Sequence, residues 1–234
     1  MNVASKVVAL VVAGGRGQRF GGPVPKQYRL LGDRSILART VAALQAHPQI
    51  DRVQVVIHRD DRALYEAAVA GLDLAEPVLG GASRQDSVRA GLEAIAAWSP
   101  ELVLIHDSVR PLVAAAVISG VIAALETGPA AMAGVPVADT LKRVAEGVVT
   151  ETVERQGLWR AQTPQGFRFA GILAAHRALA ASGREMTDDG MIAEAAGMAV
   201  AMVPGDERNF KITTEADLRL AELLVREAAG DPAA

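Results

Sequence analysis

The 234-residue chain contains no cysteine, which excludes disulfide frameworks, thiolate nucleophiles and zinc–thiolate sites. Aromatic residues make up only 3%, and the four histidines are scattered without the spacing of metal ligands. No apolar run is long enough to span a membrane, and Gly-Gly-Arg-Gly rather than a cleavage site follows the run Val7–Ala13. We therefore expect no membrane span and no signal peptide, and a cytoplasmic location.

The chain also lacks a strong net charge, because 24 basic and 27 acidic residues leave a formal charge of -3. A mildly acidic chain is a poor polyanion binder, so we expect no nucleic-acid partner. The charge is uneven, however: the segment between Gly14 and Arg34 holds five basic residues and only one acidic residue. A cationic, glycine-rich stretch in an anionic chain suggests a small anionic ligand.

Short β-branched runs alternate with amphipathic helical patterns. This alternation predicts an α/β fold with a mostly parallel, Rossmann-like sheet and helices on both faces. The carboxyl ends of its parallel strands share one edge, where ligands of such sheets bind. The expected strands are Val7–Ala13, Val53–His58, Leu102–His106 and Ala131–Val135, and the expected helical faces are Leu37/Val41/Leu44, Val88/Leu92/Ile95 and Val117/Val121/Leu125.

The pattern changes after Pro136. Segment 139–152 alternates apolar and polar residues around Glu146-Gly147, which predicts an inserted β-hairpin arm. An arm without a core needs a partner surface, so we expect a homodimer of one domain, 1–234, with a dimerisation arm at about 136–158. Helical patterns return at Phe169–Ser182 and at Thr214–Ala229, where a capping box begins the helix and Ala216, Leu220, Leu223 and Leu224 predict the buried stripe.

A glycine-rich segment directly follows the first expected strand. It fits neither the dinucleotide fingerprint, because Phe20 replaces the third glycine, nor the Walker pattern, because Lys26 follows Pro25 and precedes no Ser or Thr. Its backbone N–H groups could approach phosphates, and Arg19 and Lys26 together suit a triphosphate. The alternative is an ordinary strand–helix turn with solvated cations.

Other candidate groups have equally simple structural alternatives. Ser83 and Asp86 form a helix-capping pattern, which by itself could explain that segment. Asp107 ends an expected strand, where it could position Mg²⁺ carried by nucleotide phosphates or merely cap the next turn. Thr163 and Thr187 lie in loops before helices, where hydroxyls favour anions and also serve as caps.

An ordered set of motifs runs through the chain: Ala13-Gly14-Gly15-x-Gly17-x-Arg19, Pro25-Lys26-Gln27, Gly80-Gly81-x-Ser83-Arg84-Gln85-Asp86-Ser87, His106-Asp107-Ser108-Val109-Arg110-Pro111, Asp139-Thr140-Leu141-Lys142, Arg155 with Leu158-Trp159, Gln162-Thr163-Pro164-Gln165, Thr187-Asp188 and Asn209-Phe210-Lys211-Ile212-Thr213. This set resembles that of the 2-C-methyl-D-erythritol 4-phosphate cytidylyltransferase family of the non-mevalonate isoprenoid pathway. The resemblance covers essentially the whole chain. The sequence departs mildly from the commoner family pattern at Phe210, Thr214 and Asp189-Gly190.

The resemblance implies cytidylyl transfer from CTP to 2-C-methyl-D-erythritol 4-phosphate, with release of pyrophosphate and with Mg²⁺ as divalent cation. The catalytic positions that it implies are Arg19, Lys26, Arg155 and Lys211. The nucleotide-binding positions are Ala13, Gly14, Gly15, Gly17, Gly81, Ser87 and Asp107, of which Asp107 is also the candidate metal ligand. The substrate positions are Thr140, Arg155, Thr163, Thr187 and Lys211, with Thr140 and Arg155 reaching across a dimer.

Three alternatives stay open at this point. A ribitol-5-phosphate cytidylyltransferase shares most of these motifs, and only assays with both alcohol phosphates separate the two activities. A non-catalytic nucleotide-binding module would bind CTP without releasing pyrophosphate. The natural gene could also continue into a fused cyclase.

Overall fold

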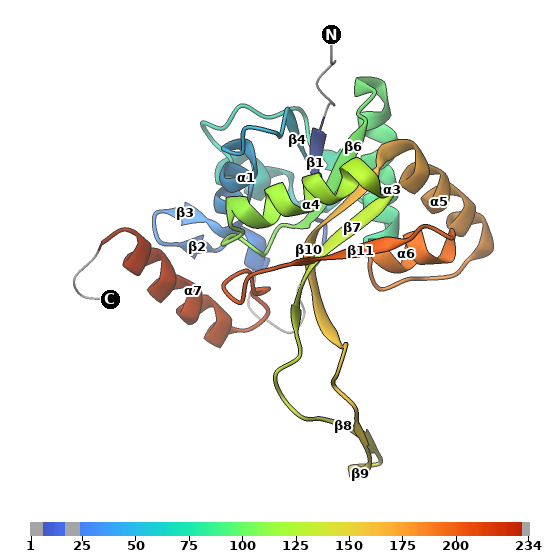
Figure 1. Cartoon of the computed structure of the whole chain (residues 1–234). Helices are drawn as coiled ribbons and strands as arrows, with labels where there is room; N and C mark the ends of the chain where they lie inside the picture. The colour runs from blue at the N-terminus through green and yellow to red at the C-terminus, as the bar shows by residue number, and fades with distance from the viewer. Residues whose placement is uncertain (1–6, 17–23, 231–234) are drawn as a thin grey trace.

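The computed structural model describes residues 7–16 and 24–230. Within these residues, seven strands form one sheet in the order β11-β7-β10-β6-β1-β4-β5 (Figure 1). Only β10 runs antiparallel to its neighbours in this sheet, so the expected mostly parallel sheet is confirmed. The strands are β1 (Val7–Ala13), β4 (Arg52–Ile57), β5 (Val78–Leu79), β6 (Leu102–Asp107), β7 (Ala130–Pro136), β10 (Trp159–Arg168) and β11 (Val200–Pro204).

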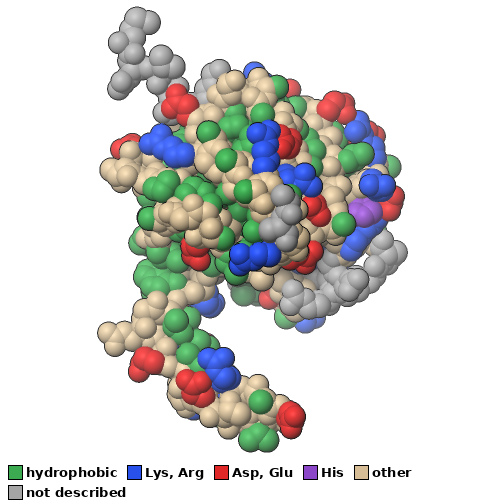
Figure 2. All heavy atoms as spheres, turned by 90° about the vertical axis from the view of Figure 1, so that its right-hand side faces the viewer, with side chains coloured by type: hydrophobic (Ala, Val, Ile, Leu, Met, Phe, Trp, Pro, Cys, Tyr) green, Lys and Arg blue, Asp and Glu red, His purple; other side chains and the backbone are tan. Residues whose placement is uncertain are grey.

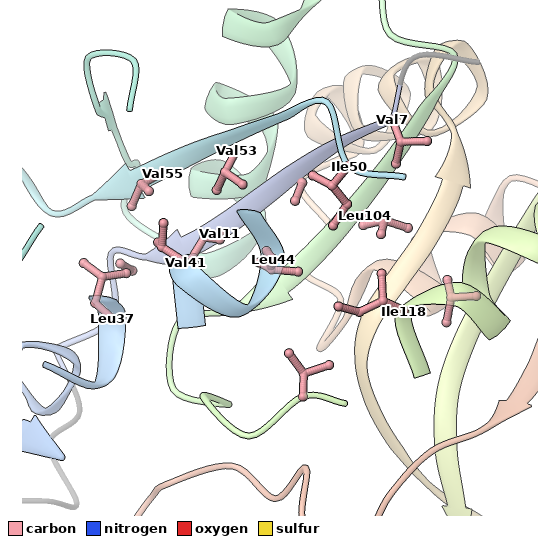
Figure 3. Close-up of a cluster of buried hydrophobic side chains, with 14 of the residues drawn as sticks. Val7, Val11, Leu37, Val41, Leu44, Ile50, Val53, Val55, Leu104 and Ile118 are labelled. Carbon is pink, nitrogen blue, oxygen red and sulfur yellow. The ribbon is translucent and has the colours of Figure 1, made fainter. Parts of the chain in front are cut away.

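Helices cover both faces of the sheet, as the sequence predicted. Alternate residues of β1 separate the two cores: Val7, Ala9 and Val11 face one, and Val8 and Leu10 face the other. The first core packs against α1 (Ile36–Gln45), α2 (Arg62–Ala68) and α4 (Ala115–Thr127), and Figure 3 shows its α1 side. The second packs against α3 (Arg84–Ile95), α5 (Phe169–Ser182) and α6 (Asp189–Ala195).

The last helix, α7 (Glu215–Ala228), begins as expected and packs differently. Thr214 and Asp217 form a complete capping box. The predicted stripe is wrong, because Leu220 and Leu223 are 48% and 50% exposed and Ala216 is exposed. Leu218 and Ala221 are buried instead, in a cluster with Leu31 of the two-residue strand β2 (Leu30–Leu31), which pairs with β3 (Arg34–Ser35). The helix carries two apolar faces at helical spacing, and periodicity alone does not show which one is covered.

The inserted hairpin is confirmed and projects away from the body of the molecule (Figures 1 and 2). Strands β8 (Leu141–Ala145) and β9 (Val148–Val153) pair antiparallel. Glu146 and Gly147 join them with φ angles of 50° and 81°, the positive values that a tight two-residue hairpin turn requires. Most of its side chains are exposed, including Val144, Val148 and Val149. This exposure fits an arm that contacts a partner, but the homodimer stays a prediction.

Candidate active site

Two adjoining cavities lie where β1 and β6 end. The larger encloses about 600 Å³ and the smaller about 160 Å³. Arg84, Asp107 and Lys211 line both, so these three residues form the shared wall. Predicted residues around the larger cavity are Gly14, Gly15, Lys26, Gly81, Ser87, Asp107 and Lys211, and those around the smaller are Asp107, Thr163, Thr187 and Lys211.

The end of β1 and the start of the glycine loop are fixed by a buried glutamine. The amide Nε2 of Gln27 donates to the carbonyl oxygens of Ala13 at 2.9 Å and Gly15 at 3.0 Å. Gln27 belongs to the short helix η1 (Lys26–Tyr28), so the same contacts place Lys26 at the cavity. The predicted residues Gly17 and Arg19 lie outside the described residues.

Arg16 joins the same loop to the turn after β4. Its guanidinium forms ion pairs of 2.8 Å with Asp60 and with the buried Asp61, both in the short helix η2 (Arg59–Asp61). The described start of the glycine loop, residues 14–16, is therefore held by Gln27 and by the ion pairs of Arg16.

Ser87 lies next to the start of the glycine loop, where a Cβ at Gly14 would be 3.2 Å from its Oγ, and its segment both caps a helix and lines the larger cavity. The Ser83 hydroxyl accepts a hydrogen bond from the Asp86 N–H at 3.0 Å, which confirms the cap of α3. The Ser87 hydroxyl donates to the Ser83 carbonyl at 2.9 Å and accepts from the Gly81 N–H at 3.2 Å. A Cβ at Gly81 would lie 2.3 Å from Asp86 Cβ, so only glycine fits without a shift of the backbone.

Asp107 lies at the centre of a cationic cluster. Its Oδ2 is 3.0 Å from Lys211 Nζ and 3.6 Å from Arg110 Nε, and its Oδ1 is 3.6 Å from Arg84 Nε. Burial by itself raises the pKa of the Asp107 carboxyl, but Lys211, Arg84 and Arg110 outweigh it and hold the pKa well below its usual range. Asp107 is thus ionised at neutral pH and cannot serve there as a general base of useful strength.

Thr163 is hydrogen-bonded to the backbone of Asp107, the carboxylate at the centre of this cluster. Its hydroxyl accepts a hydrogen bond from the Asp107 N–H at 3.1 Å and lies 3.0 Å from His106 Nδ1. Burial lowers the pKa of His106 to about 4, so the ring is neutral at pH 7. With Nε2 donating to the Arg110 carbonyl, Nδ1 accepts the Thr163 proton. The Thr163 hydroxyl therefore already has two protein partners, and the His106 ring joins Thr163 to the Arg110 carbonyl.

Two buried amide side chains hold the loop that carries Lys211. Asn209 Nδ2 donates to the Thr163 carbonyl at 2.8 Å, and Gln162 Nε2 donates to the Asp206 carbonyl at 2.8 Å. Gln162, Asn209 and Gln27 all belong to the motifs named above, but the sequence pattern did not predict a role for any of them. Polar or charged residues flank each of them in the sequence, so no local pattern marks these amides as buried.

The arm residues do not reach these cavities within one chain. Thr140 and Arg155 are exposed, and an Arg155 Nη1 hydrogen bond goes to the Ala138 carbonyl at the base of the arm. Thr187 lines the smaller cavity, with its hydroxyl 3.0 Å from Met191 Sδ. Seven of the predicted positions therefore converge on the larger cavity and two threonines on the smaller, whereas two lie on the arm.

A comparison with known proteins gives the family. The model of the family named IspD, 2-C-methyl-D-erythritol 4-phosphate cytidylyltransferase, matches residues 7–227. The chain belongs to this family. A cytidylyltransferase of this name from Cereibacter sphaeroides is 50% identical over 95% of the chain and 98% of its own length. The resemblance inferred from the motifs is confirmed.

Other IspD relatives are longer. The bifunctional enzyme IspD/IspF of Rhodospirillum rubrum is 58% identical over 95% of this chain, which spans 58% of that relative's length. Among solved structures, the cytidylyltransferase of Thermus thermophilus is 33% identical with a TM-score of 0.74, covering 93% of this chain and 98% of its own. The synthase from Anaerococcus prevotii is 28% identical with a TM-score of 0.83, covering 95% and 97%.

The oxygen ligands available at the site fit a magnesium ion that is bound mainly by substrate phosphates. Among the described residues that line the larger cavity, Asp107 is the single carboxylate, and no group of three or more His, Asp or Glu side chains in residues 7–16 and 24–230 could hold a metal. Asp107 lines both cavities, and its Oδ1 is 3.6 Å from Arg84 Nε, which is longer than a hydrogen bond. One carboxylate suits Mg²⁺ that is carried by substrate phosphates and retains water ligands.

Proposed function

We propose that this protein transfers a cytidylyl group from CTP to an alcohol phosphate, 2-C-methyl-D-erythritol 4-phosphate, and releases pyrophosphate. The observation that supports this most is the pair of cavities joined at Asp107 and Lys211, because the reaction must bring two anionic substrates into contact. Among the described residues, four cationic side chains and a single carboxylate line the larger cavity, which favours a nucleoside triphosphate. The smaller suits the phosphate of the second substrate.

In this reaction an oxygen of the alcohol phosphate attacks the α-phosphorus of CTP in line. A new P–O bond forms, and the bond between the α-phosphorus and the oxygen bridging to the β-phosphorus breaks, so that the electron pair leaves with pyrophosphate. The attacking phosphate is already ionised near neutral pH. No general base is required, which agrees with an Asp107 carboxyl of low pKa and a buried, neutral His106.

Catalysis then consists of positioning and charge neutralisation. Lys26, together with Arg19, stabilises the α-phosphate and the leaving pyrophosphate. The segment Gly81–Ser87 binds the cytosine end, since the Ser87 hydroxyl and the Gly81 backbone form that wall. Lys211 holds the incoming phosphate at the junction of the cavities, with Thr163 and Thr187 nearby.

Two parts of the proposal concern groups outside the single chain. Mg²⁺ neutralises phosphate charge when it is bound, and Asp107 is the residue that would contact it. Thr140 and Arg155 of a second copy would complete the alcohol-phosphate site, because within one chain both lie exposed on the arm. The exposed valines of the arm support such a dimer. A cytoplasmic location stays a prediction; no helix among the described residues is long and apolar enough to cross a membrane.

The test is pyrophosphate release with CTP and each of two alcohol phosphates, 2-C-methyl-D-erythritol 4-phosphate and ribitol 5-phosphate, with UTP and ATP as controls. We expect release with CTP and the erythritol phosphate. Pyrophosphate release with ribitol 5-phosphate alone would show that ribitol 5-phosphate, not the erythritol phosphate, is the acceptor. CTP binding without any release would indicate a binding module and refute the proposal.

A further inference from the structure

Behind the wall that separates the two cavities lies a second buried carboxylate, Asp189, which the proposed reaction does not use. Asp189 is the first residue of α6 and is fully buried. Its Oδ2 forms an ion pair with Arg84 Nη1 at 2.8 Å, a charge contact without hydrogen-bond geometry, and its Oδ1 lies 3.1 Å from His176 Nε2. His176, on α5, is also fully buried, and its Nδ1 has no hydrogen-bond partner within the described residues.

The backbone at Asp189 is held in place as well as its side chain. The amide oxygen Oε1 of the buried Gln165 accepts hydrogen bonds from the N–H groups of Asp189 and Gly190, both at 3.0 Å. A Cβ at Gly190 would lie 2.0 Å from Met132 Cε, so glycine lets the first turn of α6 sit against β7. The departure from the family pattern at residues 189 and 190 is therefore part of one packed arrangement.

Arg84 connects this buried pair to the site. Its guanidinium lies between two carboxylates, with Nη1 at 2.8 Å from Asp189 and Nε at 3.6 Å from Asp107. A guanidinium is planar, so fixing one nitrogen fixes the direction of its remaining donors. Arg84 and Lys211 are the two cations common to both cavities, and Asp107 contacts both.

We propose that His176 and Asp189 are positioning residues for the transfer reaction, and that they act by holding the Arg84 guanidinium toward the phosphate of the incoming substrate. This inference rests on the proposed function. Without the charge of Asp189, Arg84 closes the longer gap to Asp107 and competes with Lys211 for that carboxylate. Both cations at the junction are then displaced. His176 acts one step further back, because its Nε2–H orients the Asp189 carboxylate.

The experiment compares variants at these positions by steady-state kinetics, varying CTP and the alcohol phosphate separately, together with the melting temperature. His176→Leu removes the donor, whereas His176→Gln keeps an amide N–H at a similar reach. Asp189→Asn keeps the shape of the side chain and removes its charge. The matched control is Glu93→Gln, because Glu93 on α3 pairs with Arg177 on α5 at 2.5 Å, an exposed contact between the same two helices.

We expect His176→Leu and Asp189→Asn to lower kcat/KM for the alcohol phosphate by about tenfold or more, as misplacement of a distant support does. We expect kcat/KM for CTP to change less, and His176→Gln to retain most of the activity. The double variant should be no worse than Asp189→Asn alone, because both changes interrupt one chain of contacts. Arg84→Lys should reproduce the loss, since Lys lacks the planar fork.

The inference is overturned if these variants lower the melting temperature but match Glu93→Gln in kcat/KM. It is also overturned if His176→Leu and His176→Gln lose activity equally, or if both substrates are affected alike. These outcomes differ from failure of the proposed function, in which the unaltered protein itself releases no pyrophosphate from CTP.

Discussion

The residue on which the two-cavity arrangement most depends is Lys211, and replacing it with methionine tests that arrangement directly. Lys211→Met keeps an unbranched side chain, one heavy atom shorter, and removes its charge. The ammonium lies 3.0 Å from Asp107 and lines both cavities, with 39% of its side chain exposed. A hydrogen bond to a charged group contributes about 1.5–3 kcal/mol. We take the lower half of that range because the site is partly open to solvent, which screens the charge.

At about 1.4 kcal/mol per factor of ten, this loss predicts a fall of roughly tenfold or somewhat more in kcat/KM for the alcohol phosphate. The measurement is steady-state pyrophosphate release at saturating CTP with the alcohol phosphate varied, and then the reverse. Arg208→Gln is the matched control. Arg208 lies on the same loop and is exposed, and its ion pair with Glu227 is long, at 3.6 Å. If Lys211→Met behaves like Arg208→Gln, Lys211 does not hold the incoming phosphate and the junction has been misassigned.

Three further predictions address other parts of the site. Lys26→Ala should lower kcat by on the order of 10²-fold, because it removes transition-state stabilisation, and a near-normal kcat would contradict its role. Arg155→Ala should raise KM for the alcohol phosphate and leave that for CTP nearly unchanged; equal changes would argue against an arm that serves one substrate only. Asp107→Asn tests stability against pH. The folded-state pKa of Asp107 is depressed, so its ionised form stabilises the fold above the unfolded pKa of about 3.9, and this contribution is lost as the pH falls further. The melting temperature of the unaltered protein should therefore fall more steeply below about pH 4 than that of Asp107→Asn, whereas parallel curves would show that Asp107 does not contribute.

The elements that the sequence predicted best are those whose residues face apolar surroundings on both sides. All seven residues of β1 are buried, and a glycine segment ends the strand, so its bounds match the expected Val7–Ala13. β10 was not predicted, because it carries Gln162, Thr163 and Gln165 in its buried part. Their amide and hydroxyl groups bond to the Asn209 loop, to strand β6 and to the start of α6, all distant in sequence, and no local pattern reports such a partner.

The same distinction applies to the residues of the site. Motif positions such as Gly81, Asp107 and Lys211 could be named from the sequence and do converge on the cavities. The supports behind them could not, because each depends on a pairing across the fold, such as Arg84 with Asp189 at 2.8 Å. Arg84 stood inside a quoted motif, but a lone arginine at a helix start is most simply a solvated side chain. Only its buried partner distinguishes it from one.

The low net charge of the chain and the cationic cavity now have a common physical basis. An arginine in a partly buried site must be held in one direction to be useful, and here carboxylates do this, of which Asp107 itself lines both cavities. Asp60 and Asp61 hold Arg16, Asp189 holds Arg84, and Asp107 faces Arg110. The acidic residues that bring the total charge to -3 thus include those that orient the cations of the site. A summed charge cannot reveal an anion site built in this way, because each orienting acid cancels a cation in the sum, although at Arg16 and Arg84 the arginine lines the larger cavity and its aspartate partners Asp60, Asp61 and Asp189 do not.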